Sequence, residues 1–317
     1  MFLVINQNVE KKKEWVLINM GYRVVFLANA VNLSVKNEQL IIDNGSITKI
    51  PLEDIQCIAS DTVQLNINAY LLMKFSEYAI TFYITDRAHH PCGVFLPVSR
   101  HSRHMSVLNS QIAMSLPTKK KLWKQIVYQK IENQATVLKL CAIADWTSVD
   151  CIKLKIKSGD VSNMEAVAAA KYFKLLFGSN FTRNQENKIN SCLNYGYAVL
   201  RSTIEKYLIV YGYEPALGIF HKSTQNNFNL ADDIIEAYRP LVDLFVKYNI
   251  FDDGDLTTHN KAQIVNLLNA DVVIDNKLYA CSKAIEKTVE SLTSFISGKR
   301  EDLLLPQLID LEQHSYE

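Results

Sequence analysis

Hydrophobic positions follow two different periods along this chain, and the change falls near residue 97. Before that point, short runs rich in Val, Ile, Phe and Tyr alternate with polar turns, a pattern typical of β-strands. Asp43-Asn44-Gly45 predicts a hairpin turn, and residues 68–78 predict one short helix. The predicted strands are residues 22–27, 39–42, 47–51, 55–59 and 80–84.

After residue 97, hydrophobic residues recur at the three- and four-residue intervals of helices with one buried face. Pro117 and Pro240 interrupt these runs, and Gly178 and Gly212 stand where helices commonly end. The two periods together predict an α+β protein, with a small β-rich, β-sandwich-like domain followed by a larger all-α domain. The predicted helices are residues 107–114, 119–144, 163–177, 187–212, 230–246, 261–268 and 278–298.

The composition is that of a globular protein whose 317 residues form one large domain or two ordinary ones. The 48% of hydrophobic residues supplies a core, and 21% of charged residues argues against disorder. Six scattered cysteines, without a Cys-x-x-Cys pair, argue against a zinc knuckle and a disulfide framework. No apolar run is long enough to span a bilayer. We therefore expect a soluble, cytoplasmic protein with no membrane partner.

The charge distribution is more informative than the formal net charge of +1. No Asp or Glu occurs between Arg87 and Ile131, although this interval is rich in Lys, Arg and His. A solvated basic face explains the interval as well as contact with a phosphate backbone does. The residues that we expect to contact DNA are Arg100, Arg103, Lys119, Lys120, Lys121 and Lys124.

His221 begins the segment with the most chemistry, in which a polar loop and then three carboxylates follow an imidazole. Asn229 is the predicted N-cap of a helix over residues 230–238 that stops at Pro240. On this helix Glu236 is four residues from Asp232 and three from Asp233, so either pair projects from one face. Carboxylates that repel one another beside a histidine suit a divalent metal ion, although a solvated helix face explains the spacing equally well.

Glu165 is the second acidic residue of interest, in the first turn of a helix that Ser162 or Asn163 caps. A favourable interaction with the helix dipole, of about 0.3–1 kcal/mol, is the simpler explanation of its position. Four alanines between residues 166 and 170 nevertheless leave a slim helix that another element can approach closely.

Convergence of Glu165, His221 and Glu236 would give a mixed set of nitrogen and oxygen ligands. Such a set suits Mn²⁺ or Mg²⁺ better than Ca²⁺, with Zn²⁺ as an alternative. A metal ion there activates a hydroxyl nucleophile and stabilises charge on a phosphoryl oxygen. With the basic interval, this suggests metal-dependent phosphodiester chemistry on a nucleic acid.

Motifs over nearly the whole chain resemble one known family, the integrase–endonuclease of CRISPR adaptation (the first-numbered Cas protein), in its type II form. Several long segments in the same order make chance similarity an inadequate explanation. The segments are Gly21-Tyr22-Arg23-Val24-Val25, residues 33–40, His90-Pro91-Cys92-Gly93, Leu96-Pro97, Gln129-Lys130-Ile131-Glu132-Asn133-Gln134, Asn163-Met164-Glu165-Ala166, residues 172–177, Phe181-Thr182-Arg183, Asn194-Tyr195-Gly196-Tyr197 and residues 228–242.

The resemblance implies a fold, a ligand set and a reaction. It implies a β-rich domain over residues 20–97 for dimerisation and partner contacts, a linker over residues 98–105 and a catalytic helical domain over residues 106–317. The family's Glu, His and acidic metal ligands fall on Glu165, His221 and Glu236. Asp233 matches a further acidic position near the metal, which favours it over Asp232.

In the implied reaction, the 3′-hydroxyl ends of captured DNA fragments attack phosphodiesters at the edge of a CRISPR repeat. The implied partners are double-stranded DNA, a second copy of the chain, the small ferredoxin-like second-numbered Cas protein and the type II effector nuclease. Relatives start near Met20-Gly21, so we expect residues 1–19 to be an extension or the product of an upstream start, and we assign them no function.

Where relatives often have Arg before the metal-binding glutamate, this chain has Met164, so we expect Arg183 or Lys171 to bind DNA phosphate instead. Two other function classes remain as alternatives. A non-catalytic nucleic-acid scaffold would bind DNA in a salt-dependent manner without cleaving it. A zinc hydrolase of a small substrate would carry tightly bound Zn²⁺, but the acid-free basic interval argues against it.

Overall fold

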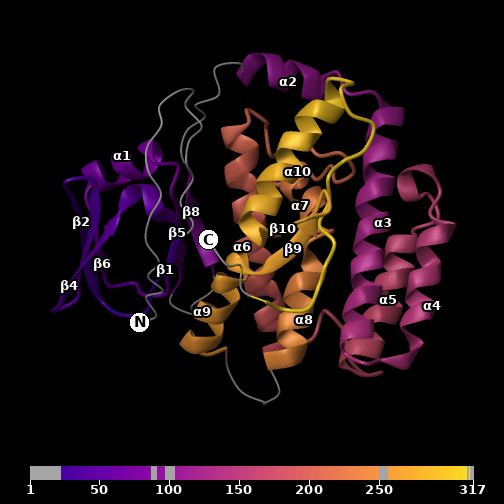
Figure 1. The fold of residues 1–317 in the computed structure, drawn as a ribbon, viewed down its shortest axis with the longest axis horizontal. Coiled ribbons are helices and arrows are strands. Elements are labelled where there is room, and N and C mark those ends of the chain that lie inside the picture. The colour runs from indigo at the N-terminus through magenta and orange to yellow at the C-terminus, as the bar shows by residue number, and fades with distance from the viewer. Residues whose placement is uncertain (1–22, 87–90, 97–103, 250–255, 313, 315–317) are drawn as a thin grey trace.

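The computed structural model of the chain describes residues 23–86, 91–96, 104–249, 256–312 and 314, which form a β-rich part and a mainly helical part packed side by side (Figure 1). The proposed extension, residues 1–19, lies outside the described residues, as do Arg100 and Arg103. Within the described ranges, no helix is both long and apolar enough to cross a membrane.

The β-rich part contains two four-stranded sheets and one helix, α1 (Ala69–Glu77). One sheet has the order β1-β5-β7-β8 and the other β4-β3-β2-β6. The Asp43–Gly45 turn joins β3 to β4 as predicted, with Gly45 at φ 98° and its N–H donating to Asp43 Oδ1. The strands are β1 (Arg23–Leu27), β2 (Val31–Lys36), β3 (Gln39–Asp43), β4 (Ile47–Pro51), β5 (Ile55–Ser60), β6 (Leu65–Asn66), β7 (Thr81–Thr85) and β8 (Pro91–Phe95).

Strand β5 packs against both parts of the molecule, and all six of its residues are buried. It lies between the parallel strands β1 and β7, and both faces of its sheet are covered. Ile58 belongs to the core between the sheets and α1, whereas Cys57 and Ala59 belong to the core of the helical part. The alternation of side chains along one strand therefore joins two hydrophobic cores.

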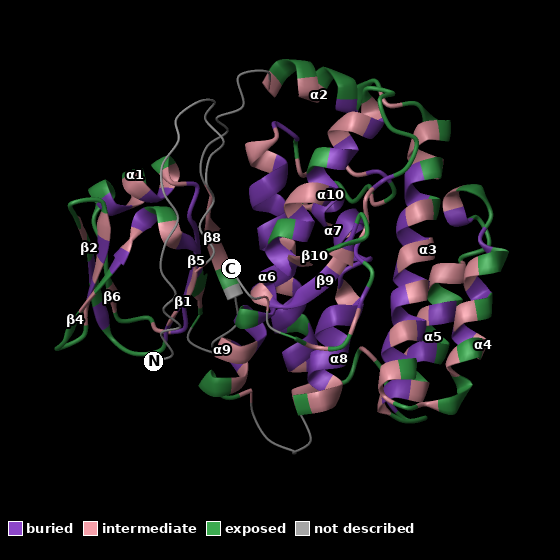
Figure 2. Ribbon diagram, in the orientation of Figure 1, coloured by how far each residue is buried: buried purple, intermediate pink, exposed green. Residues whose placement is uncertain are grey.

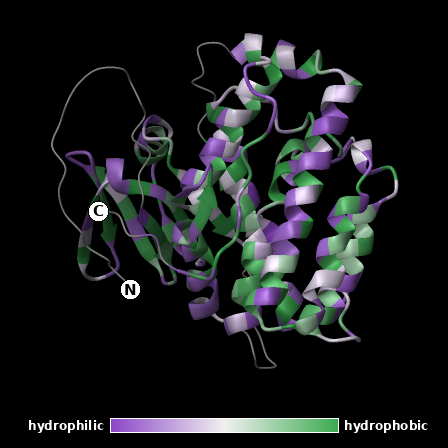
Figure 3. Ribbon diagram, turned by 45° about the vertical axis from the view of Figure 1, so that its right-hand side comes forward, coloured by the Kyte–Doolittle hydropathy of each residue, from purple (hydrophilic) through white to green (hydrophobic). Residues whose placement is uncertain are grey.

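The mainly helical part surrounds a long helix, α6, most of which is buried (Figure 2). Hydrophobic and hydrophilic residues alternate around the helices of this part (Figure 3), as expected when each helix buries one face. The helices are α2 (His104–Ile112), α3 (Leu116–Leu140), α4 (Thr147–Asp150), α5 (Met164–Phe177), α6 (Lys188–Val210), α7 (Asn229–Ile235), α8 (Arg239–Asn249), α9 (Thr258–Asn266) and α10 (Cys281–Ile296).

The prediction of a β-rich part followed by a helical part is confirmed, but the second part also contains a hairpin. Strands β9 (Asp271–Ile274) and β10 (Lys277–Ala280) pair antiparallel around Asp275 and Asn276, which both have positive φ. The predicted helix over residues 278–298 is therefore wrong in its first turn, because α10 begins at Cys281. Its opening residues belong to β10, whose few hydrophobic positions fit a strand as well as a helix.

Pro240 lies in the first turn of a helix instead of ending one. Helix α7 ends at Ile235, and Pro240 is the second residue of α8, where the missing N–H would have no partner within the helix. The continuous helix predicted over residues 230–246 is thus two helices with a turn between them. Glu236 lies at the start of that turn.

A segment after α10 returns along α3 (Figure 1). The N–H of Leu303 donates to Gln125 Oε1 at 2.7 Å, and Asn133 Nδ2 donates to the carbonyl of Pro306 at 2.9 Å. Leu303 and Leu308 are buried in the core of the helical part. Residues 303–308 therefore pack against α3 and are held there by hydrogen bonds and by buried leucines.

The predicted linker, residues 98–105, is partly described: residues 98–103 lie outside the described residues, whereas His104 and Met105 already belong to α2. The other domain boundaries stay predictions, because β5 and β7 share a core with the helices.

Candidate active site

Three helices bring the candidate acidic ligands to one place. Helix α3 carries Lys130, whose ammonium group contacts the carboxylates of Glu165 on α5 and Glu236 just after α7. The side chains of Lys130 and Glu236 are each 6% exposed, and that of Glu165 is 26% exposed. Residues far apart in the sequence are therefore joined by a single buried cation.

The position of Glu165 depends on Asp160, and not on the predicted caps Ser162 and Asn163. Asn163 is in the left-handed conformation and its side chain makes no capping bond. Asp160 instead accepts hydrogen bonds from the N–H groups of Met164 and Glu165, both at 2.9 Å. This carboxylate satisfies the first free N–H groups of α5 and so fixes the start of the helix and the position of Glu165.

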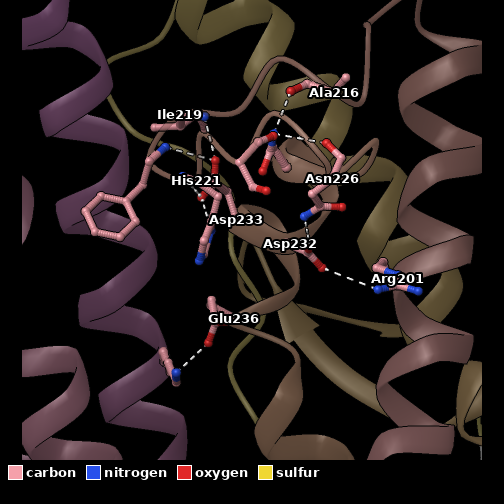
Figure 4. Close-up of polar contacts among 12 residues, drawn as sticks. Arg201, Ala216, Ile219, His221, Asn226, Asp232, Asp233 and Glu236 are labelled. Atoms are coloured by element: carbon pink, nitrogen blue, oxygen red, sulfur yellow. Dashed lines mark hydrogen bonds and ion pairs between the residues drawn. The ribbon is translucent and has the colours of Figure 1, made fainter.

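His221 is oriented by Asp233, a carboxylate whose side chain is fully buried. Oδ1 of Asp233 lies 2.7 Å from Nδ1 of His221, and its oxygens also accept from the N–H groups of Ile219, Phe220 and His221. A carboxylate beside Nδ1 favours the neutral tautomer with its proton on Nδ1, in which the Nε2 lone pair is free for a ligand. In Figure 4 the ring extends from Asp233 toward Glu236.

The two neighbouring aspartates have different surroundings (Figure 4). Asp233 is the inward carboxylate, whereas Asp232 accepts a hydrogen bond from Asn226 at 2.7 Å and lies 3.8 Å from Arg201. Of the two aspartates, Asp233 and not Asp232 therefore points toward His221 in the folded chain.

Asn229 was predicted to cap α7, and this prediction is wrong. Asn229 is the first residue of the helix, and its buried Nδ2 donates to the carbonyls of Ala216, Ser223 and Asn226. The two N–H groups of a side-chain amide can donate to several carbonyl groups of one loop and so fix its backbone. Asn229 therefore stabilises the loop that contains His221.

Electrostatic interactions favour the charged forms of Glu236 and Lys130 despite their burial. Burial opposes the charged form of Glu236, but Lys130 and Arg239 outweigh it and lower the pKa of this carboxyl group. Burial likewise opposes the charge on Lys130, yet the two glutamates raise the pKa of its ammonium group. The hydrogen bond to Asp233 raises the pKa of His221. The site is thus a set of mutually stabilised charges.

Arg239 connects the site to a second buried cluster. Its Nη1 lies 3.2 Å from Glu236 Oε1, and its guanidinium lies 5.0 Å from the centre of the Tyr197 ring. The hydroxyl groups of Tyr197 and Tyr172 both donate to Asp243. Sequence reasoning counted Lys130 only as part of the basic interval and assigned no role to Asp160, Arg239 or Asp243, although Lys130 and Arg239 lie within the quoted family segments.

The donor set fits a divalent metal ion, but the described side chains do not close around one. Within the described ranges, no three His, Cys, Asp or Glu side chains are grouped closely enough to hold an ion. Glu165 and Glu236 nevertheless converge on one cationic group, the Lys130 ammonium, and the nearby His221 side chain is 40% exposed. Two carboxylates and an imidazole are suitable ligands for Mg²⁺ or Mn²⁺.

The residues predicted to contact DNA have varied surroundings. On α3, Lys119 and Lys120 are half-buried and Lys124 is exposed, while Lys121 lies over the Phe295 ring at 5.5 Å. Their contact with DNA stays a prediction.

The two residues proposed to replace the missing Arg have partners within the protein. Lys171 lies 3.4 Å from Asp145. Arg183 donates to Asn190 and Asn194 and lies over the Phe173 and Tyr197 rings. Met164 packs against the core.

Sequence comparison places the chain among known proteins. The model of the family described as CRISPR associated protein Cas1 matches residues 24–263. A CRISPR-associated endonuclease Cas1 from Neisseria meningitidis is 39% identical over 311 residues, which cover 94% of this chain and all of that protein. Another, from Saccharolobus solfataricus, is 27% identical and aligns over 67% of this chain and 70% of that protein.

Solved structures share the fold at low sequence identity. A casposase bound to integration product gives a TM-score of 0.73 at 19% identity, covering 89% of this chain and 92% of that one. A Cas1 protein from Thermotoga maritima gives a TM-score of 0.70 at 16% identity, covering 88% of this chain and 98% of that one. Because a family model matches well over half of its residues, the chain belongs to the CRISPR-associated Cas1 family, the endonucleases and integrases of spacer acquisition.

Proposed function

We propose that Glu165, His221 and Glu236 bind Mg²⁺ or Mn²⁺ and that the chain joins the 3′-hydroxyl ends of captured DNA fragments to a CRISPR repeat. The observation that supports this most strongly is the convergence of two carboxylates, one on α5 and one just after α7, on one cation beside an imidazole fixed by Asp233. A divalent ion bound there supplies activation of a hydroxyl nucleophile and stabilisation of charge on a phosphoryl oxygen.

The chain's own residues prepare this chemistry. Asp233 fixes the His221 ring so that Nε2, and not Nδ1, is presented to the site. Lys130 and Arg239 keep Glu236 deprotonated despite its burial. Asn133 donates to the carbonyl of Ala237 at 2.8 Å, so α3 also holds the backbone next to Glu236. Preorganised groups of this kind avoid reorganisation during the reaction.

The proposed partners follow from the relatives. A Cas1 related to this chain is part of a solved Cas6-RT-Cas1–Cas2 complex, and the casposase is bound to integration product. We infer double-stranded DNA as the substrate, both as fragment and as repeat, with a small Cas2-type protein bridging homodimers. Residues 20–97 would supply dimer contacts, and the effector nuclease of a type II system would be a further partner.

Strand transfer tests the proposal. The purified chain, with and without a Cas2-type partner, would be incubated with a DNA fragment and a supercoiled plasmid that carries a repeat. We expect joining with Mn²⁺ or Mg²⁺ that is lost in EDTA and reduced at least about 100-fold in Glu165→Ala and His221→Ala.

Circular dichroism would show that both variants fold, and Glu186→Ala, which removes an exposed carboxylate outside the site, is the matched control. Full joining by either site variant would refute the ligand assignment. DNA binding by the wild type without joining, under every metal and partner condition, would instead favour a non-catalytic scaffold.

A further inference from the structure

Phe220 is a large aromatic residue that the fold leaves in water beside the candidate active site. It exposes 48% of its surface, although it lies directly before His221. Its ring is 5.5 Å from the imidazole ring, at an interplanar angle of 86°. An exposed aromatic side chain this close to the candidate site can offer a flat surface to a ligand.

Trp123 of α3 supports the Phe220 ring from one side. The two ring centroids are 4.2 Å apart and the planes differ by 1°, so the rings are stacked face to face. Trp123 is only 3% exposed and is therefore covered on its other sides by the core. Since one face of Phe220 covers Trp123, the exposed surface of Phe220 includes its opposite face.

The backbone also fixes this pair. The N–H of Phe220 donates to Asp233 Oδ2 at 3.0 Å, and the neighbouring residues Ile219 and His221 donate to the same carboxylate. One buried side chain thus sets the positions of both the imidazole and the exposed aromatic ring. A ring with little freedom loses little entropy when a flat ligand stacks on it.

The chemistry of a nucleic-acid substrate identifies the ligand. Every nucleobase has a π-face, and stacking on an aromatic side chain requires that the base be unpaired or displaced from the duplex. Lys119 and Lys120 precede Trp123 by four and three residues, so they add positive charge to the same side of α3, where phosphates would be attracted. Aromatic face and cations together are the usual composition of a single-strand binding site.

We propose that Phe220, stacked on Trp123, is a platform for an unpaired nucleobase next to the phosphodiester that reacts. The proposal rests on the proposed function of the His221 site. The base belongs either to the 3′ end of the incoming fragment or to the edge of the repeat. Both sources share the same chemistry, and the experiment distinguishes them.

Binding would be measured in EDTA, so that the readout does not depend on metal or on reaction. A branched DNA would carry 2-aminopurine either at the fragment's 3′-terminal nucleotide or at the first nucleotide of the repeat. We expect quenching of one probe by the wild type and by Phe220→Trp, and loss of that quenching in Phe220→Ala. The affinity of Phe220→Ala for the DNA should fall by roughly 5- to 100-fold.

Two controls make the test specific. Leu217→Ala removes another exposed apolar side chain of the same loop and should leave affinity and quenching unchanged. An abasic nucleotide at the probe position should weaken wild-type binding and abolish its difference from Phe220→Ala. Unchanged quenching and affinity in Phe220→Ala would overturn the platform, as would an equal loss in Leu217→Ala.

Failure of the platform and failure of the proposed function are distinguishable. If the wild type performs strand transfer but Phe220→Ala keeps full binding and quenching, only the platform is refuted. If the wild type binds neither probe DNA, both proposals fail.

Discussion

A lysine ammonium group occupies the point where the carboxylates of Glu165 and Glu236 meet. Without a cation between them, two carboxylates that both contact one small group would repel each other, so that their pKa values would rise or the side chains would move apart. Lys130 therefore keeps the site assembled while no other cation is bound. It also competes with any divalent ion for the same oxygens.

The first prediction concerns Lys130→Met, which keeps the length of the side chain and removes its charge. In EDTA the variant should lose about 3 kcal/mol of stability, because Glu236 stays buried and keeps its ion pair with Arg239 but loses the one with Lys130. Mn²⁺ should bind at least about tenfold more tightly than to the wild type and should restore stability. Calorimetric titration and thermal unfolding measure both effects.

Lys124→Met, an exposed change on the same helix, is the control and should alter neither quantity. Weaker Mn²⁺ binding by Lys130→Met would contradict the competition and would mean that the ammonium group orients the carboxylates for the ion.

The second prediction concerns Asp243, whose pKa burial raises from 3.8 to about 6 in spite of hydrogen bonds from Tyr197 and Tyr172. A raised pKa means that the folded state binds the proton more tightly than the unfolded state. The stabilisation is complete below about pH 4 and is lost as the pH rises through about 6. This amounts to about 3 kcal/mol.

Denaturant unfolding of the wild type and Asp243→Asn between pH 4 and 7 isolates this group from the other carboxylates. The free energy of unfolding of the wild type relative to the variant should fall as the pH rises across this range. A constant difference would show that Asp243 does not titrate there.

At the scale of elements, sequence periodicity predicted most helices and several strands, because each buries one continuous stripe of apolar residues. It failed where a few residues fit two periods, as in β9 and β10, and where tertiary contacts decide. Asn229 has the chemistry of a cap but instead bonds to three loop carbonyls. The pairing of Lys130 with Glu236 spans 106 residues, and no local pattern encodes it.

The third prediction concerns the packing of α6 on α8. A Cβ atom added at Gly196 would lie 2.4 Å from Cγ1 of Val242 and 3.2 Å from Ile264. Gly196→Ala should therefore destabilise the chain by about 1–3 kcal/mol, although alanine has the higher helix propensity. Thermal unfolding measures the effect. Ser191→Ala, at a half-buried position of the same helix, should change stability little.

At the scale of the whole molecule, a buried ion pair joins the β-rich part to the helical part. Nζ of Lys261 on α9 lies 3.0 Å from Oδ1 of Asp61, and both side chains are less than 5% exposed. Lys206 on α6 adds a bond of 3.1 Å to the carbonyl of Gln56. Polar groups buried between two parts fix their relative orientation only if their partners are present.

The fourth prediction uses this pair. Asp61→Ala should cost about 3–5 kcal/mol, because it leaves the Lys261 charge buried. The double variant Asp61→Ala with Lys261→Met should recover a large part of this loss. A double-mutant cycle of unfolding free energies gives the coupling. Additive losses would mean that the pair contributes nothing to the contact between the two parts.

The segment that returns along α3 has a consequence for synthesis of the protein. The side-chain amide of Asn133 donates two hydrogen bonds. One goes to the carbonyl of Ala237, beside Glu236, and the other to the carbonyl of Pro306, which lies 173 residues further along the chain. During translation, α3 leaves the ribosome long before this partner exists. The backbone beside Glu236 therefore lacks this second anchor of Asn133 until residue 306 has also left the ribosome.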